Sequence, residues 1–257
     1  MAVLTTPAIL LRAVDYGESD RVTTLLGRNT GCVSAIARGA RKSQRRFGGG
    51  LGLCTLGDAV LRERGSAELL TLERFDVTRS FLSAGGDLER MGHAAYVAEL
   101  ATKLCAPRQA EPGIFDFMVT FLEGLDAGGG RDERLRIFEI GLLDRLGFAP
   151  ALDACAVCGR RDLSTTPGVI DVRWVPDQGG VVCRACGTRG RPMRPVVRLA
   201  LLKHARTSLD APGMEAVPAD VGRGCRDALH ELIAGHLSAP LRSLEFLAKM
   251  QVTEKGP

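Results

Sequence analysis

The chain has 257 residues, of which 45% are hydrophobic and 25% charged, so it can bury a core and is not a disordered chain. Charges interrupt its apolar runs well short of the ~20 residues that a membrane span requires. The opening segment, MAVLTTPAILLRAVDYGESD, lacks a basic region followed by a small-residue cleavage site. We therefore expect an unexported, cytoplasmic protein.

Positive charge is unevenly distributed, although the formal net charge is only +4. Seven cations and no acid lie between residues 21 and 57, and seven cations and no acid lie between residues 178 and 209. Separated charge of this kind indicates a polyanionic partner bound on particular surfaces. The alternative is two solvated basic loops that have no partner.

The N-terminal part of the chain has the pattern of a β-structure. Short apolar or alternating runs, separated by turn signals, predict strands at 7–14, 21–27, 32–37, 57–64 and 67–75. Because no helical pattern intervenes, these strands favour a small barrel over a βαβ unit.

The segment ARGARKSQRRFGGG, residues 37–50, lies between the third and fourth predicted strands, and we expect a loop or hairpin tip that is not a core element. Its cations are Arg38, Arg41, Lys42, Arg45 and Arg46. A small barrel with such a loop is similar to the OB-fold, whose surface commonly binds nucleic acid. These cations would neutralise phosphates without reading the bases. Phe47 is the one aromatic residue of the segment, so we expect little base stacking.

Helical periodicity replaces the strand pattern after Gly86. It predicts helices at 87–106, 113–127, 131–148, 194–209, 220–237 and 240–250. The expected organisation is α+β, with an OB-fold domain at 1–82 and an α-helical bundle at 83–257 that contains a loop-rich insert at 151–190.

Two CxxC pairs in this insert are the most specific chemical signal in the sequence. They are Cys155 with Cys158 and Cys183 with Cys186. Their spacing is typical of a structural zinc site, and the segment between them predicts a short hairpin too small to bury a core alone. The alternatives are unrelated reduced pairs, a redox dithiol, which lacks its βαβ surroundings, and a catalytic zinc, for which four sulfurs leave no open position.

The remaining cysteines are scattered singly in apolar surroundings, which indicates reduced, buried thiols; they are Cys32, Cys54, Cys105 and Cys225.

A further expectation concerns the edges of the amphipathic helices. Cations there could border an apolar groove that suits an acidic peptide ending in apolar residues. They are Arg134, Arg136, Lys203 and Arg206.

Four segments in order resemble the bacterial RecO family of DNA repair and recombination mediators, over nearly the whole chain. They are GCVSAIARGARKSQRRFGGGL, ELLTLERFDVTRSF, LRIFEIGLLDRLGFAPALDACAVCG and LEFLAKM. The resemblance implies an N-terminal OB-fold, a C-terminal helical bundle and a zinc-finger-like insert with four cysteine ligands. The family's basic loop maps onto the five loop cations and its zinc ligands onto the four CxxC cysteines.

The resemblance also implies a function. Members of this family bind single- and double-stranded DNA, anneal complementary strands and, with RecR and in some pathways RecF, help load RecA onto strands coated by single-stranded DNA-binding protein. They hold the acidic C-terminal tail of that coat protein. We therefore expect a nucleoid-associated mediator and not an enzyme.

Two other functions stay open at this point. One is a zinc-stabilised adaptor that grips acidic protein tails and has no direct DNA function. The other is an enzyme with an unrecognised site, although the sequence has no phosphate-binding P-loop, nucleophile motif or metal-binding carboxylate cluster.

Overall fold

The computed structural model describes residues 2–43, 45–48, 50–63, 69–82, 88–128, 131–211 and 214–253, without the side chains of 248–253. Gly49, the predicted strand ends at 64 and 67–68, and the start of the predicted first helix lie outside the described residues. The chain divides into two compact units. One comprises Met1–Gly130 with Leu241–Pro257, and the other comprises Arg131–Pro240.

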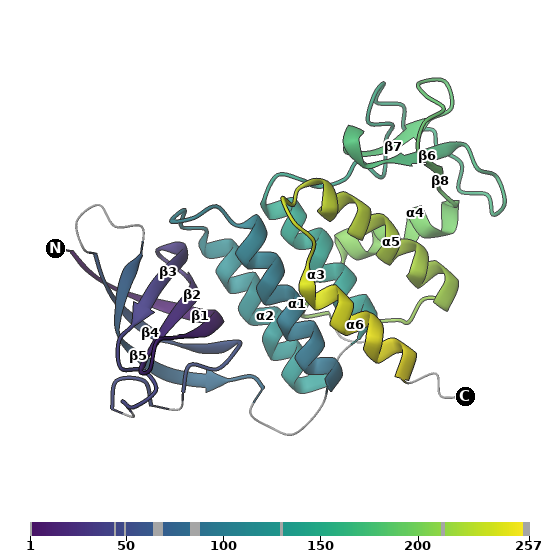
Figure 1. The fold of residues 1–257 in the computed structure, drawn as a ribbon. Coiled ribbons are helices and arrows are strands. Elements are labelled where there is room, and N and C mark those ends of the chain that lie inside the picture. Colours follow the sequence, from purple (N-terminus) through teal and green to yellow (C-terminus); the bar gives the residue numbers. More distant parts are fainter. Residues whose placement is uncertain are drawn as a thin grey trace. The chain divides into compact units, whose positions relative to one another are not determined.

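The N-terminal strands close into a barrel (Figure 1). They are β1 Val3–Tyr16, β2 Asp20–Gly27, β3 Gly31–Ala37, β4 Thr55–Arg62 and β5 Leu70–Ser80. Their order around the barrel is β1-β2-β3-β5-β4; β3 and β5 pair in parallel and the other neighbours are antiparallel. This is a five-stranded Greek-key barrel, so the predicted OB-fold is confirmed.

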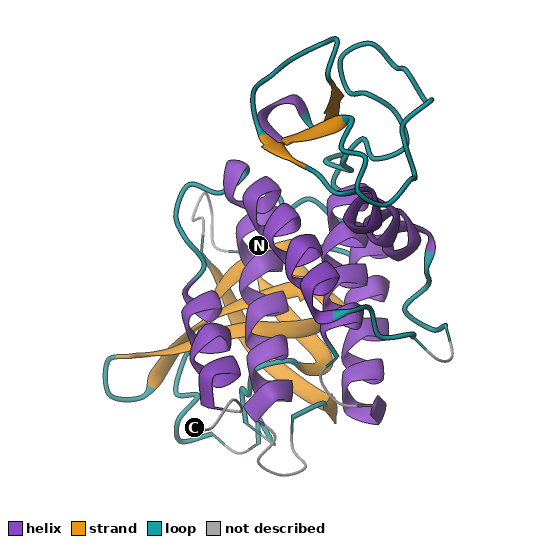
Figure 2. Ribbon diagram, turned by 90° about the vertical axis from the view of Figure 1, so that its right-hand side faces the viewer, coloured by secondary structure: helices purple, strands orange, loops and turns teal. Residues whose placement is uncertain are grey.

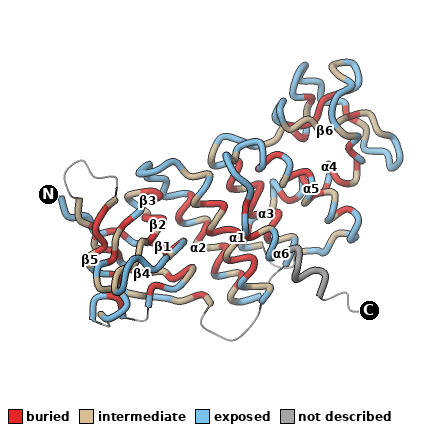
Figure 3. Tube along the Cα trace, in the orientation of Figure 1, coloured by how far each residue is buried: buried red, intermediate tan, exposed pale blue. Residues whose placement is uncertain are grey.

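Alternation along the strands builds the barrel core. Every second side chain points inward, and Leu10, Leu25, Leu61 and Phe75 are almost fully buried there. The middle of β1 is buried, whereas its last residues, from Arg12 to Tyr16, are half-buried or exposed (Figure 3). The strand therefore extends beyond the core and carries the β1–β2 turn into solvent.

Three helices complete the first unit: α1 Leu88–Leu104, α2 Pro112–Gly128 and α6 Arg242–Thr253. Helix α1 packs against β1, β2 and α6, and α2 packs against β1. The α1–α2 link runs along the start of β3, where the Arg108 amide donates to the Cys32 carbonyl at 2.9 Å. Gly31 allows this close approach, because a Cβ there would lie 1.9 Å from the Gln109 carbonyl oxygen. Helices α1 and α2 thus contact the barrel directly, and α6 is joined to it through α1.

The second unit is built on three helices: α3 Asp132–Arg145, α4 Pro195–Arg206 and α5 Ala219–Gly235. Each packs against the other two. The predicted helices of both units are confirmed, with ends that differ by a few residues. Among the described helices, none combines the length and the apolar character needed to cross a bilayer.

The cysteine-rich insert, together with the two residues that follow it, carries a small sheet of order β7-β6-β8. Its strands are β6 Val172–Val175, β7 Gly180–Cys183 and β8 Arg191–Pro192. The predicted hairpin between the CxxC pairs is the antiparallel β6–β7 pair, joined through the 3-10 turn η1, Pro176–Gln178. Figure 2 shows that the rest of the insert is mostly loop. Fully buried Trp174 is the largest side chain in its core.

Candidate nucleic-acid interface and metal centre

The basic loop between β3 and β4 is fixed at its start to the β1–β2 turn. The Gly39 amide donates to Asp20 Oδ1 at 2.8 Å, and the Arg41 amide donates to the Ser19 carbonyl at 3.1 Å. Gly39 has a φ of 63°, a left-handed conformation that glycine adopts without strain. The loop therefore leaves β3 in a defined direction.

Phe47 fixes the same loop at its middle. Its ring is 3% exposed and belongs to the barrel core, and the Phe75 amide of β5 donates to the Arg46 carbonyl at 2.9 Å. The segment is a loop, as expected, but the expectation that it is not a core element was wrong for Phe47, which lies in the barrel core. A buried ring cannot stack on a base, so Phe47 is not an aromatic contact for nucleic acid.

All five loop cations lie at the surface. Within the described residues, Arg41 is the one that forms an ion pair, 3.8 Å from Asp15. Hydrogen bonds from Gly39 and Ser19, together with the charge of Arg38, lower the pKa of Asp20. The end of β1 and the start of β2 thus supply acids that the sequence alone did not place beside the loop. Exposed pairs of this kind are weak, about 0–1 kcal/mol, so they leave the cations available to a partner.

Arg46 is held by neutral groups. Its Nη2 donates to the Arg38 carbonyl at 2.7 Å, its Nε donates to Ser43 Oγ at 3.2 Å, and its guanidinium lies 5.3 Å from the centre of the Phe47 ring. These contacts orient the charge without neutralising it. Lys42 and Arg45 are exposed and have no hydrogen bond or ion pair from their side chains to another described residue.

Most cations of the second basic window, 178–209, form contacts within the protein. Three of its cations pair with acids from α5 or the segment before it: Arg191 with Glu231, Arg194 with Asp220 and Lys203 with Glu215, at 2.9, 2.8 and 2.7 Å. Arg198 is 3% exposed and donates to the carbonyls of Leu152, Leu163 and Ser164. Arg184, Arg189 and Arg206 are left exposed, with no ion pair to another described residue.

The four cations that were expected to border one groove differ in their exposure to solvent. Arg136 is 4% exposed and lies 3.1 Å from the buried carboxylate of Glu139, with His230 at 3.3 Å. It is an interior residue, and the expectation that it stands at a helix edge was wrong, because it carries the charge that balances Glu139. Arg134 is half-buried and donates to the Leu209 carbonyl at 3.1 Å. Only Lys203 and Arg206 are exposed.

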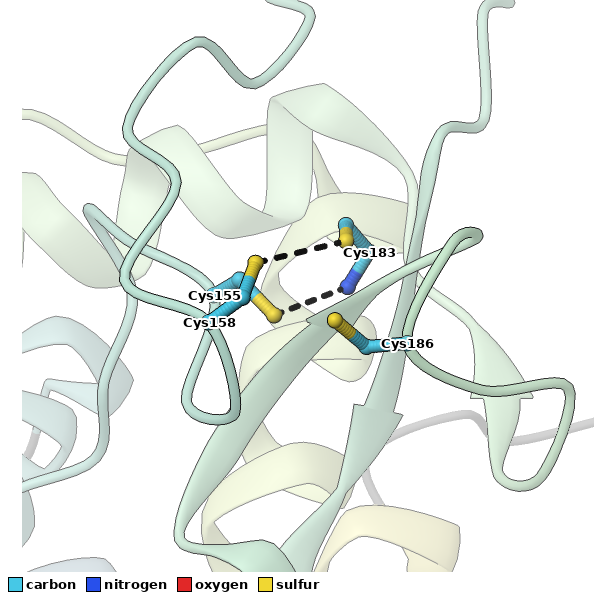
Figure 4. A group of neighbouring side chains, drawn as sticks. All are labelled: Cys155, Cys158, Cys183 and Cys186. Atoms are coloured by element: carbon cyan, nitrogen blue, oxygen red, sulfur yellow. Dashed lines mark hydrogen bonds between the residues drawn. The ribbon is translucent and has the colours of Figure 1, made fainter.

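The two CxxC pairs converge on one point, as Figure 4 shows. The sulfurs of Cys155, Cys158, Cys183 and Cys186 all lie within 4.8 Å of one another, and Cys158 Sγ is 3.9 Å from Cys183 Sγ. Four thiolates at ~2.3 Å from a tetrahedral zinc ion would be about 3.8 Å apart. The predicted ligand set is therefore brought together with a geometry that could hold a metal ion.

The chemistry of these sulfurs also fits a cation. Burial raises the pKa of Cys155, but backbone amides of Cys158, Cys183 and Val157 donate to its sulfur and lower the pKa to about 6. Cys186 donates to Cys158 and Cys183, which raises its pKa to about 12. Four crowded thiols cannot all ionise by themselves, whereas a divalent cation would stabilise all four thiolates.

The other cysteines are free thiols, as expected. Cys32, Cys54 and Cys225 are buried, and Cys105 is half-buried. Burial raises the pKa of Cys32 and Cys225 to about 11 and that of Cys54 and Cys105 to about 12. These thiols are therefore protonated near neutral pH and unreactive.

The structure places one further aromatic residue beside the loop, which was not expected from the sequence. Tyr16 ends β1 and is 61% exposed. Its position in the turn-rich stretch DYGESD, at the end of an alternating strand, is the signal that could have identified it.

Comparisons with known proteins assign the family. The family model described as "Recombination protein O N terminal" matches residues 1–81, and the model described as "Recombination protein O C terminal" matches residues 85–245. The chain is 43% identical over 242 residues to a protein from Anaeromyxobacter sp. (strain K) named DNA repair protein RecO, covering 93% of each chain. It is 35% identical to the proteins of that name from Myxococcus xanthus and Geobacter sulfurreducens, covering 95% of this chain and 96% of each relative. The predicted resemblance is confirmed, and the chain belongs to the RecO family.

Proposed function

We propose that this protein is a DNA-binding mediator of recombinational DNA repair. It binds single- and double-stranded DNA through the barrel domain at 1–82, anneals complementary strands and, with RecR and in some pathways RecF, helps load RecA onto strands coated by single-stranded DNA-binding protein. The cations that contact phosphates are Arg38, Arg41, Lys42, Arg45 and Arg46. Relatives named DNA repair protein RecO support this role. We propose that the protein acts in the cytoplasm, in association with the nucleoid.

One observation carries the proposal. The loop is fixed by Gly39 at its start and by Phe47 in the barrel core, yet its cations are exposed. Because the loop is already ordered in the free protein, less conformational entropy is lost when DNA binds. Each phosphate contact then releases counterions from the DNA and adds affinity that does not depend on sequence.

Annealing follows from the same charges. Two strands repel through their phosphates, and a surface that neutralises several phosphates lowers this repulsion and concentrates the strands. No covalent step is required, so we propose that the protein acts by binding DNA and not as an enzyme.

The proposed cofactor is a structural Zn²⁺ held by Cys155, Cys158, Cys183 and Cys186. When bound, the zinc ion would cross-link the two CxxC turns. It would not be catalytic, because four thiolate ligands leave no coordination position for water. The insert that it would stabilise is attached to α4 through buried Arg198.

Salt dependence of DNA binding tests the main proposal. Five phosphate contacts would give a log–log slope of roughly −4 on duplex and −3 on single strands. Replacing Arg41, Lys42 and Arg45 with alanine should weaken binding to all sequences and reduce the slope on duplex by about three units, at about one per contact. The matched control is the alanine triple variant of Arg184, Arg189 and Arg206, which removes three exposed cations from the second unit. A slope near zero for the wild-type protein, or equal losses for both triple variants, would contradict the role of the loop.

Strand annealing extends this test. Complementary oligonucleotides are mixed with and without single-stranded DNA-binding protein, and the wild type is compared with the two triple variants. The loop variant should lose annealing in proportion to its loss of binding, while the control variant keeps it.

A second proposed contact is with the acidic C-terminal tail of the coat protein. Of the groove cations predicted, Lys203 and Arg206 on α4 are exposed, and Lys203 already pairs with Glu215. Reversing both charges should weaken binding of a tail peptide if α4 takes part. The adaptor alternative predicts tail binding with little DNA affinity.

A further inference from the structure

Tyr16 is the most exposed large hydrophobic side chain in the described part of the chain, at 61% of its full accessible area. Its side chain makes no hydrogen bond or ring contact with another described residue. A single exposed tyrosine is common in proteins, so its meaning depends on what surrounds it.

Apolar side chains continue from Tyr16 across the neighbouring strands on the outer face of the barrel. Val14 lies two residues earlier on the same face of β1 and is 43% exposed. Val14 pairs across the sheet with Val22, and Val22 pairs with Ile36; both partners are half-buried. Tyr16 and these three side chains form an apolar strip across β1, β2 and β3.

The basic loop begins directly beside this strip. Tyr16 pairs with Asp20 in the β1–β2 register, and Asp20 Oδ1 accepts the hydrogen bond from the Gly39 amide. The turn that follows Tyr16 accepts hydrogen bonds from Arg41, through the carbonyls of Glu18 and Ser19. Tyr16 is thus fixed to the same backbone network that positions the loop cations.

A cation also lies on the other side of the strip. Arg12 is exposed and on the same face of β1 as Val14, two residues before it. Arg38, whose charge acts on Asp20, lies beyond the end of β3. An apolar strip between phosphate-binding groups is the arrangement by which proteins bind single strands, with bases on the rings and phosphates on the cations.

We infer that Tyr16 is a base-stacking residue that makes this surface prefer single-stranded over duplex nucleic acid. The inference rests on the proposed function, and it adds a contact to the bases that the loop cations do not supply. In duplex DNA the bases are stacked on one another, so no base face is available to stack on the Tyr16 ring. Single strands can place a base on Tyr16 while the loop cations hold the adjacent phosphates.

Fluorescence anisotropy of a labelled oligonucleotide, single-stranded or annealed to its complement, tests the inference. Tyr16→Ala and Tyr16→Leu should each weaken single-strand binding by roughly tenfold, within the range of stacking contributions, and change duplex binding less than about twofold. Tyr16→Phe keeps the ring and should bind both as the wild type does. Val3→Ala is the matched control, because Val3 is a 51% exposed side chain at the other end of the same strand.

Photocrosslinking gives a measurement on the unaltered protein. A single strand that contains 5-iodouracil should crosslink to the peptide with Tyr16, and the same sequence in duplex form should not. If the loop triple variant loses binding while the Tyr16 variants keep it and no crosslink forms at Tyr16, the stacking inference is wrong and the proposed function stands. If the wild type binds neither form of DNA, the proposed function fails and the inference fails with it. A tyrosine variant that weakens both forms equally also overturns the single-strand preference.

Discussion

The carboxylate of Glu99 in α1 accepts two hydrogen bonds from Ser243 at the start of α6, from its amide at 2.8 Å and from its hydroxyl at 2.6 Å. The Arg242 amide also donates to this carboxylate, at 3.0 Å. A side chain distant in sequence therefore caps the first turn of α6. This contact joins the C-terminal helix to the helix that packs on the barrel.

Glu99→Gln should lower the free energy of unfolding by about 1–3 kcal/mol, because hydrogen bonds to a charged group are stronger than those to an amide. Urea denaturation at neutral pH measures the loss. Glu245→Gln is the control, since Glu245 is an exposed acid in the first turn of the same helix. Equal stability of the two variants would contradict a capping role for Glu99.

The same contact predicts a dependence on pH. Burial opposes ionisation of Glu99, but the hydrogen bonds from Ser243 and Arg242 hold its pKa below the ordinary value of 4.5. A lowered pKa in the folded state gives stability that is present above the unfolded value and is lost as pH falls through the folded value. Wild type and Glu99→Gln should therefore converge in stability on acidification below pH 4.5. Thermal unfolding measured at several pH values checks this convergence.

Phe47→Ala should destabilise the first unit by about 3–5 kcal/mol, because it leaves a cavity in the barrel core. It should also weaken DNA binding by the folded protein, since Arg46 and the loop backbone lose their anchor. Phe47→Leu, which keeps most of the apolar volume, should retain more of both. Denaturant unfolding and anisotropy measure the two effects, and unchanged stability in Phe47→Ala would show that the ring does not lie in the core.

Arg198→Met should destabilise the second unit, because the carbonyls of Leu152, Leu163 and Ser164 lose a buried donor. The expected cost is about 1–3 kcal/mol or more, set by leaving buried acceptors unsatisfied. Arg206→Met in the same helix is the control, since Arg206 is exposed. Hydrogen exchange should show faster opening of the insert in the Arg198 variant alone, and equal exchange in both variants would rule out the anchoring role.

Removal of metal provides the test for the cysteine cluster. We expect one zinc per chain by elemental analysis and its loss in Cys183→Ser, with a lower unfolding temperature and faster proteolysis of residues 151–190. Cys105→Ser should keep full zinc content, because Cys105 lies outside the cluster. The structural role would be refuted by an insert that stays protected from protease after a strong chelator has removed the metal.

Much of the molecule follows from local patterns in the chain. Alternation in strands and three- to four-residue periodicity in helices predicted the barrel and the helices, because each pattern reflects one face packed on a core. The CxxC spacing likewise predicted the sulfur cluster, since a tight turn places its two sulfurs on one side of an ion. Charge counting identified the loop cations, although it could not place Asp15 of β1 and Asp20 of β2 beside them.

The sequence by itself determined which segments are strands, helices and cysteine-bearing turns, because these depend on neighbours within a few residues. Only the tertiary structure decided what individual charged and aromatic side chains do. It buried Phe47 in the barrel and Arg136 beside Glu139, paired three of the seven cations of the second basic window with acids elsewhere in the chain, and left Tyr16 exposed beside the loop. The physical reason is that burial and ion pairing depend on residues brought together from distant parts of the chain, which no local pattern encodes.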